Sequence, residues 1–146
     1  MGGSHRQESV FNALKLSSSD IVVIHDGARP MIRQEYIVNS LLELNNFPGT
    51  SIAVKSKDTI KITDDNGVVT QTTQRSNTWV IQTPQCFNRE ILMNCYLDQK
   101  ISENLTDDCM LLEQAGHRIK LISGDYTNIK ITTQEDIRIL AELISR

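Results

Sequence analysis

The sequence has little that would suit a disulfide-rich, metal-centred or membrane-spanning protein. Only three of its 146 residues are cysteines, an odd number without CxxC spacing, so we expect reduced thiols. The three histidines show no metal-ligand spacing. No apolar run approaches the roughly 20 residues that span a bilayer, and the first residues lack the apolar core of a signal peptide. These absences favour a cytoplasmic protein.

A general excess of positive charge is also absent. Fifteen basic and eighteen acidic side chains give a formal net charge of -3. A field of that sign attracts neither nucleic acid nor an anionic membrane surface, so any anion site must be local. The chain order contains no Ser-His-Asp or Cys-His arrangement typical of nucleophilic catalysis.

What is present is an alternation of helical and strand patterns along residues 1–146, which fits one domain with a sizeable core. The patterns predict helices at 6–17, 33–46, 88–101, 106–116 and 132–146. They predict buried strands at 21–25 and 51–55, further strands at 79–82 and 118–123, and an apolar segment at 128–131. Strands separated by helices imply parallel βαβ units, so we expect an α/β fold with a doubly wound, three-layer sheet.

Several residues predict where these helices begin and end. Asn88 and Thr106 are expected N-caps, and Thr132 has capping-box spacing with Glu135. Gly116 is the expected stop after the fourth helix.

Residues 57–76 follow a different pattern. Two runs rich in Thr, Ile and Val flank an Asn66-Gly67 pair, the strongest short-range signal for a β-hairpin. We expect a protruding β-arm. A two-stranded hairpin is marginally stable alone, so the arm is expected to pack on something, such as a second subunit.

The strand at 21–25 runs directly into "HDGARP". In open parallel sheets the ligand crevice lies beyond the carboxyl ends of the strands. There Asp26 suits a divalent cation that bridges phosphate oxygens, and Arg29 suits a phosphate. The alternative is an Asp26 that caps its own turn and an Arg29 that pairs with it at the surface.

Other polar residues fall in comparable positions. Thr83 and Lys130 lie at predicted strand ends, although alternation alone would also place Lys130 in solvent. Arg75, on the return side of the hairpin, reads equally as surface charge. The glycines of "MGGSHRQESV" precede a helix and expose backbone N–H groups, a weak signal for ligand approach.

The motifs taken in order are more specific than any one of them. "GGSHRQESV", "VIHDGARP", "KDTIK", an arginine before "TW", "IQTPQCF", "TDDCMLLEQAG" and "TNIKITTQEDI" cover essentially the whole chain. Their wording and spacing resemble the 2-C-methyl-D-erythritol 4-phosphate cytidylyltransferase family of isoprenoid biosynthesis. The related ribitol-5-phosphate cytidylyltransferases of teichoic acid synthesis share many of these motifs, but "KDTIK" and "TDDCMLLE" are closer to the first family.

The resemblance implies a Rossmann-like αβα nucleotidyltransferase fold and a homodimer formed through the β-arm. It also implies a reaction between CTP and a sugar-alcohol phosphate, with Mg²⁺ as cofactor and no protein nucleophile. Asp26 would hold the metal and Ala28 would lie by the ribose. Arg29 would face the acceptor phosphate, and Arg75 would reach the neighbouring subunit's acceptor site.

Two further groups of residues carry over from the family motifs. The acceptor or its phosphate would be held by Thr59, Thr83, Thr106 and Lys130. The cytosine would be bound by Gly3, Ser4 and Ser9, although position 4 often carries an acidic residue in the family.

The family pattern begins with a strand and a glycine-rich, basic loop around the CTP triphosphate, and this sequence starts after that block. We therefore expect an N-terminally truncated member whose activity alone is negligible. The alternative hypothesis is a non-catalytic dimerisation or binding module.

Overall fold

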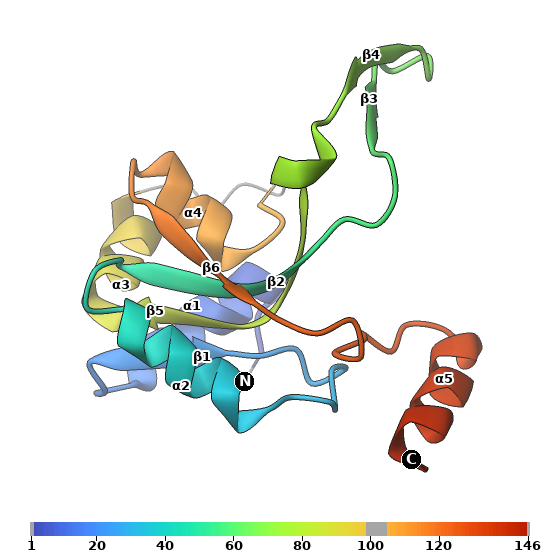
Figure 1. Ribbon diagram of the computed structural model, residues 1–146. Helices are drawn as coiled ribbons and strands as arrows, with labels where there is room; N and C mark the ends of the chain where they lie inside the picture. The colour runs from blue at the N-terminus through green and yellow to red at the C-terminus, as the bar shows by residue number, and fades with distance from the viewer. Residues whose placement is uncertain (1, 99–104, 146) are drawn as a thin grey trace.

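The computed structural model describes residues 2–98 and 105–145 (Figure 1). The helices are α1 (Arg6–Leu16), α2 (Gln34–Glu43), α3 (Arg89–Asp98), α4 (Asp108–Gln114) and α5 (Gln134–Ile144), with a 3₁₀ turn, η1 (Arg75–Asn77). The strands are β1 (Ile21–Ile24), β2 (Gly49–Lys55), β3 (Lys61–Thr63), β4 (Val69–Thr72), β5 (Trp79–Asn88) and β6 (Ile119–Ser123). Each predicted helix is present among the described residues, although the predicted end of the third helix, at 99–101, lies outside them. Residues 128–131 form no strand.

The main sheet has the strand order β1-β5-β2-β6. β2 and β6 are parallel, as expected of a βαβ unit, whereas β5 runs antiparallel to both β1 and β2, so the expectation of parallel units does not extend to β5. The reason is the arm between β2 and β5. It returns the chain beside the strand it left, pairing Lys55 with Trp79, and an antiparallel neighbour needs no helical crossover.

Helices cover both faces of this sheet, which confirms the three-layer α/β prediction (Figure 1). On one face Tyr36 of α2 packs with Ile52 and Ile122. On the other, helices α1, α3 and α4 enclose a larger core around Phe87 and Leu92. The sheet is therefore packed on both faces, and polar loops project from the ends of its strands.

Strand β1 is not buried as predicted. Ile21 and Val23 are 40% and 43% exposed, while Val22 and Ile24 pack against the core. The physical reason is position, since among the described strands β1 pairs only with β5 and lies at the sheet edge. Helix α5 lies to one side of the sheet (Figure 1), and none of its described residues is buried.

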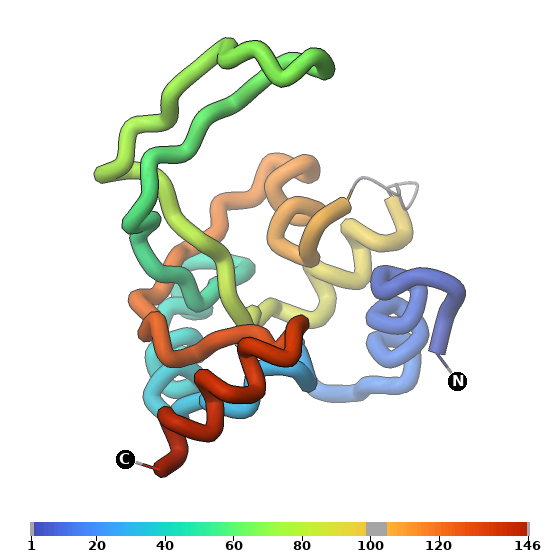
Figure 2. Tube along the Cα trace, turned by 90° about the vertical axis from the view of Figure 1, so that its right-hand side faces the viewer, coloured from blue at the N-terminus to red at the C-terminus, as the bar shows by residue number. Residues whose placement is uncertain are grey.

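The β-arm is present as a hairpin that projects from the sheet (Figure 2). β3 and β4 pair with each other in a separate two-stranded sheet, and their side chains are exposed. Gly67 has a φ of +79°, which a residue with a side chain rarely adopts. The Asp64 carboxylate accepts hydrogen bonds from the backbone N–H groups of Asn66 and Val68, so the turn is stabilised locally.

The caps agree with the sequence in two cases and differ in two. Asn88 accepts a hydrogen bond from the Ile91 N–H, as expected of an N-cap, and α4 stops before Gly116. Asp107, not Thr106, caps α4, because its carboxylate accepts from the Met110 N–H. The capping box of α5 is one residue later than predicted and joins Thr133 to Asp136, whose carboxylate accepts from two backbone N–H groups.

Candidate active site

A cavity of about 260 Å³ lies where the loop after β1 meets the middle of β5. Five residues singled out from the sequence line it: Asp26, Arg29, Thr83, Thr106 and Lys130. They come from segments distant in the chain, so the fold assembles the cluster. Thr83 lies inside the longer β5 and not at a strand end as predicted.

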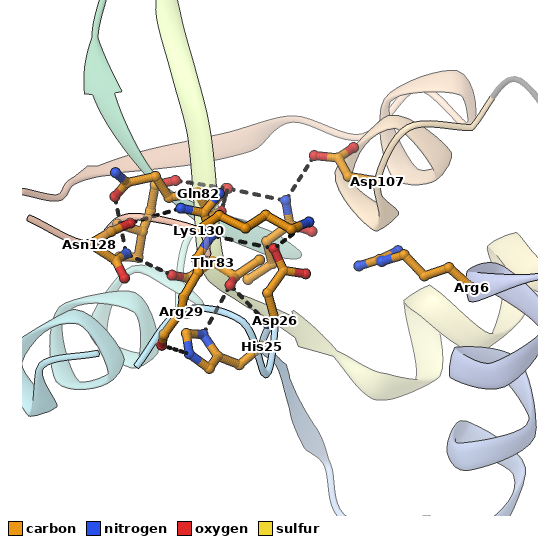
Figure 3. A network of polar contacts seen from close by, with 12 residues as sticks. Arg6, His25, Asp26, Arg29, Gln82, Thr83, Asp107, Asn128 and Lys130 are labelled. Atoms are coloured by element: carbon orange, nitrogen blue, oxygen red, sulfur yellow. Dashed lines mark hydrogen bonds and ion pairs between the residues drawn. The ribbon is translucent and has the colours of Figure 1, made fainter. Parts of the chain in front are cut away.

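Asp26 is at the centre of the cluster (Figure 3). Its Oδ2 lies 3.1 Å from the Lys130 ammonium and 3.3 Å from Nε of Arg29. Partial burial raises the pKa of Asp26, but the hydrogen bonds and charges of Lys130 and Arg29 outweigh it, so the pKa lies below its ordinary value. The carboxylate is therefore ionised at neutral pH and is shared between two cations.

The Asp26 loop is fixed by Thr83 and His25. The backbone N–H of Asp26 donates to the Thr83 hydroxyl oxygen at 3.0 Å, and that hydroxyl lies 3.0 Å from Nδ1 of His25. Nε2 of His25 lies 2.9 Å from the Arg29 carbonyl, which can only accept. The Nε2–H tautomer satisfies both contacts, because Nδ1 is then free to accept from Thr83. His25 thus orients the loop without facing the cavity.

Asn128 connects this loop to the segment that carries Lys130. It is fully buried, and its amide donates to the Gln82 side chain at 3.1 Å and to the Thr83 carbonyl at 3.0 Å. The backbone carbonyl of Asn128 accepts from Nη1 of Arg29 at 2.8 Å. The Ile131 N–H donates to the carbonyl of Ala28 at 2.8 Å, so a second contact, next to Lys130, joins the two segments.

Arg6 and Asp107 approach the cavity from its other side (Figure 3). The Arg6 guanidinium forms an ion pair of 2.7 Å with the buried Asp108. Partial burial lowers the pKa of Arg6, but the charge and hydrogen bond of the Asp108 carboxylate outweigh this effect, so the pKa lies above its ordinary value. Asp107 accepts a hydrogen bond of 2.8 Å from the buried Gln85 amide.

Apart from Ala28 in the Asp26 loop, the remaining predicted site residues form two groups outside the cavity lining. At the start of α1, the Gly3 N–H donates to the Ser9 hydroxyl at 2.8 Å, and Ser4 donates to Glu8 at 2.6 Å. At the base of the arm, Arg75 donates to the Thr59 hydroxyl at 2.8 Å. Both groups are exposed or half-buried within this chain.

The cavity also contains residues that the sequence analysis did not single out: Arg6, Gln82, Gln85 and Asp107, with Asn128 beside them. Some signals were available. Arg6 lies inside the "GGSHRQESV" motif, Asp107 follows Thr106, and two glutamines interrupt an apolar strand. Asn128 gave no signal, because only the folded chain shows that its amide is buried.

The residues present fit a phosphate-bridging Mg²⁺ better than a protein-enclosed metal. Within residues 2–98 and 105–145, no three His, Cys, Asp or Glu side chains gather as a metal-binding group. Mg²⁺ commonly takes one or two carboxylates and completes its coordination with water and substrate phosphates. An ionised, partly exposed Asp26 beside two cations supplies such a carboxylate.

The family model of 2-C-methyl-D-erythritol 4-phosphate cytidylyltransferase matches residues 1–146. The chain belongs to this family. The cytidylyltransferase of Alkaliphilus oremlandii is 44% identical over 146 residues, which are 98% of this chain and 62% of that protein. The enzyme of Fusobacterium nucleatum is 47% identical over 142 residues, 95% of this chain and 62% of that protein.

Solved structures of cytidylyltransferases have the same fold as this chain. The 4-diphosphocytidyl-2C-methyl-D-erythritol synthase of Anaerococcus prevotii matches with a TM-score of 0.92 and 37% identity, over 99% of this chain and 68% of that one. The Thermus thermophilus cytidylyltransferase matches with a TM-score of 0.83 and 28% identity, over 99% of this chain and 71% of that one. The Rossmann-like α/β prediction is confirmed, and the chain spans 62% of the length of those two curated relatives.

No helix among the described residues has both the length and the apolar character needed to cross a bilayer.

Proposed function

We propose that the protein transfers CMP from CTP to 2-C-methyl-D-erythritol 4-phosphate with release of pyrophosphate, in the cytoplasm where CTP is supplied. The observation that carries the proposal is the cluster of Asp26, Arg29 and Lys130 around one cavity, in a chain of the cytidylyltransferase family. One acid between two cations suits a polyanionic ligand that arrives with a divalent metal.

In the proposed reaction, an oxygen of the acceptor phosphate attacks the α-phosphorus of CTP. The bond from that phosphorus to the β-phosphate oxygen breaks, and pyrophosphate leaves. Proton abstraction is not required, because the attacking phosphate oxygen is already anionic. The protein's contribution is thus position and positive charge where the transition state spreads negative charge.

Arg29 and Lys130 are proposed to hold the acceptor phosphate. Both now bind Asp26, and a phosphate that enters the cavity offers them an alternative anion. Arg29 is also fixed by the Asn128 carbonyl, so its position depends little on the ligand. Lys130 is 47% exposed and has the freedom to follow the phosphate. Thr83 and Thr106 line the same cavity and supply hydroxyl groups.

Asp26 is proposed to hold the Mg²⁺. When bound, the metal supplies Lewis-acid charge on the phosphate oxygens. The low pKa of Asp26 keeps the carboxylate ionised for this role. Gly3, Ser4 and Ser9 at the start of α1 are proposed to contact the cytosine, and the Ala28 backbone the ribose.

The exposed pair of Thr59 and Arg75 is proposed to complete the acceptor site of a second subunit in a homodimer. The pair lies on an arm that projects away from its own sheet, and within this chain it does not line the Asp26 cavity (Figures 1 and 2). A guanidinium held by one hydroxyl on a projecting hairpin is well placed to bind an anion outside its own subunit.

The test is a chimera of the Alkaliphilus oremlandii relative in which these 146 residues replace the aligned part. Pyrophosphate release is measured with CTP, Mg²⁺ and methylerythritol phosphate, and the CDP-alcohol product is identified by ³¹P NMR. Ribitol 5-phosphate is the control acceptor, and the 146-residue chain is assayed in parallel. We expect turnover by the chimera with methylerythritol phosphate, and negligible turnover by the 146-residue chain alone. A folded chimera that releases no pyrophosphate with either acceptor would support the binding-module hypothesis instead.

A further inference from the structure

Arg6 is the first residue of α1, and its side chain faces the cavity from the wall opposite the Asp26 loop (Figure 3). The side chain is 37% exposed, whereas its partner Asp108 is fully buried. The ion pair therefore has one end in the protein interior and one end in the cavity.

The buried end of this pair is fixed. Oδ2 of Asp108 accepts from Nη2 of Arg6 at 2.7 Å, and Oδ1 accepts from the Tyr96 hydroxyl at 2.5 Å. Both carboxylate oxygens of Asp108 are thus occupied, and its ion pair with Nη2 anchors the guanidinium at the cavity wall. Among the residues that the structure describes, Arg6 donates no other side-chain hydrogen bond, so its remaining N–H donors are available to a ligand.

Stability alone is a poor reason for this arrangement. A positive charge in the first turn of a helix is opposed by the helix dipole. A buried ion pair can often be replaced by apolar side chains without loss of stability. Binding of an anion in the cavity would explain a guanidinium at this position better than a contribution to stability does.

The cavity has cations on both sides. Arg29 and Lys130 lie on the Asp26 side and Arg6 lies on the α1 side. Arg6 also stands in sequence between Ser4 and Ser9, which are proposed to bind cytosine, and its partner Asp108 follows Thr106 and Asp107 of the cavity. A phosphate bound between the two sides could be contacted by Arg6 from one side and by Arg29 and Lys130 from the other.

We propose that Arg6 is a phosphate-binding residue of this site, held by Asp108 and Tyr96 so that its guanidinium contacts phosphate oxygens of the nucleotide or of the acceptor. The proposal deepens the proposed function, on which it rests for the identity of the ligands. A fixed guanidinium binds a phosphate with two donors and less entropy loss than a free lysine.

The test separates two roles of Arg6, binding of a ligand and neutralisation of the buried Asp108 charge. Calorimetry measures binding of pyrophosphate with Mg²⁺, CTP with Mg²⁺, and methylerythritol phosphate to the 146-residue chain. Arg6→Gln removes the guanidinium but leaves the Asp108 charge buried. The double variant Arg6→Gln/Asp108→Asn removes that charge as well, so we expect its melting temperature to return close to that of the wild type.

If Arg6 binds phosphate, the double variant binds at least one probe about tenfold or more weakly than the wild type despite its restored stability. Loss with methylerythritol phosphate alone assigns Arg6 to the acceptor, and loss with pyrophosphate and CTP assigns it to the nucleotide. Wild-type affinity for all probes in the double variant overturns the proposal, as does a wild-type chain that binds none of them.

Two further variants keep the result interpretable. Arg6→Lys retains the charge beside Asp108 and is expected to bind several-fold more weakly, because two-point contact is lost. It carries the test if the double variant does not fold, and unchanged affinity in it then overturns the proposal. The matched control is Arg118→Gln, which changes an exposed arginine beside Phe47 and should leave the affinity unchanged.

The outcome also distinguishes this proposal from the proposed function. If phosphate binding depends on Arg6 but the chimera shows no turnover, the proposed function is refuted and the Arg6 site is retained.

Discussion

The Asp26 cavity and the β-arm contain residues proposed for one reaction, but they are built in opposite ways. Around the cavity, Asn128 joins segments far apart in the chain: its side chain donates to the Thr83 carbonyl, 45 residues away, and its backbone carbonyl accepts from Arg29, 99 residues away. The arm is exposed and is stabilised by its own turn and a two-stranded ladder. The comparison predicts that the cavity residues contribute to both folding and function, whereas the exposed arm residues contribute to function alone.

Asp26→Asn has the largest expected effect. The substitution removes the charge that is proposed to hold the metal and that pairs with Lys130 and Arg29, so kcat of the chimera should fall on the order of 10³-fold. Pyrophosphate release measures it. Asp65→Asn, in the exposed turn of the arm, is the control that should leave kcat unchanged. A comparable loss in both variants would contradict the role of Asp26.

Arg75→Ala should lower activity about 10–100-fold while leaving the melting temperature unchanged, because the side chain is exposed and bonds only Thr59 among the described residues. Each subunit of the proposed dimer lends its arm to the other. Mixing inactive Asp26→Asn chains with Arg75→Ala chains should therefore restore activity, since one site of each mixed dimer is intact. Failure of an equimolar, refolded mixture to exceed either parent would show that the arm serves its own subunit.

Asn128→Ala should act on stability first. Two hydrogen bonds from a buried amide are lost, and their acceptors at Gln82 and Thr83 are left without that donor. The free energy of unfolding should fall by about 1–3 kcal/mol, measured by urea denaturation. The exposed Asn45→Ala is the matched control. An Asn128 variant as stable as the control would mean that the interlocking contacts contribute little.

The smallest effect concerns pH. The folded pKa of Asp26 lies below its unfolded value of 3.8, so the stabilisation is present above that value and is lost as the pH falls through the folded pKa. The melting-temperature difference between wild type and Asp26→Asn should be constant from about pH 8 to 5 and shrink below about pH 4. A difference that disappears already near pH 6 would contradict the low pKa of Asp26.

The sequence predicted much of the fold because its signals are local. Helix periodicity, the Asn66-Gly67 turn and the stop at Gly116 each depend on neighbouring residues, and each appears in the structure. Strand direction and burial are not local. β5 runs antiparallel because the arm returns it beside β2, and β1 is half-exposed because it lies at an edge. A run of apolar residues such as 21–24 reads the same in both situations.

The site divides in the same way. Asp26 and Arg29 follow a predicted strand, so their pairing could be inferred from the chain alone. The segment that carries Lys130 meets the Asp26 loop through the Asn128 and Ile131 backbone contacts, and Arg6 is paired with the distant Asp108. Both arrangements depend on tertiary contacts between residues about 100 positions apart, which no local pattern encodes.

The measurement that tests the central claim most directly is a crystal structure of the chain with Mg²⁺ and methylerythritol phosphate. The account predicts the metal on the Asp26 carboxylate, the acceptor phosphate on Arg29, and the Lys130 ammonium moved from Asp26 to that phosphate. A bound phosphate outside the cavity, with Asp26 still paired to Arg29 and Lys130, would contradict it.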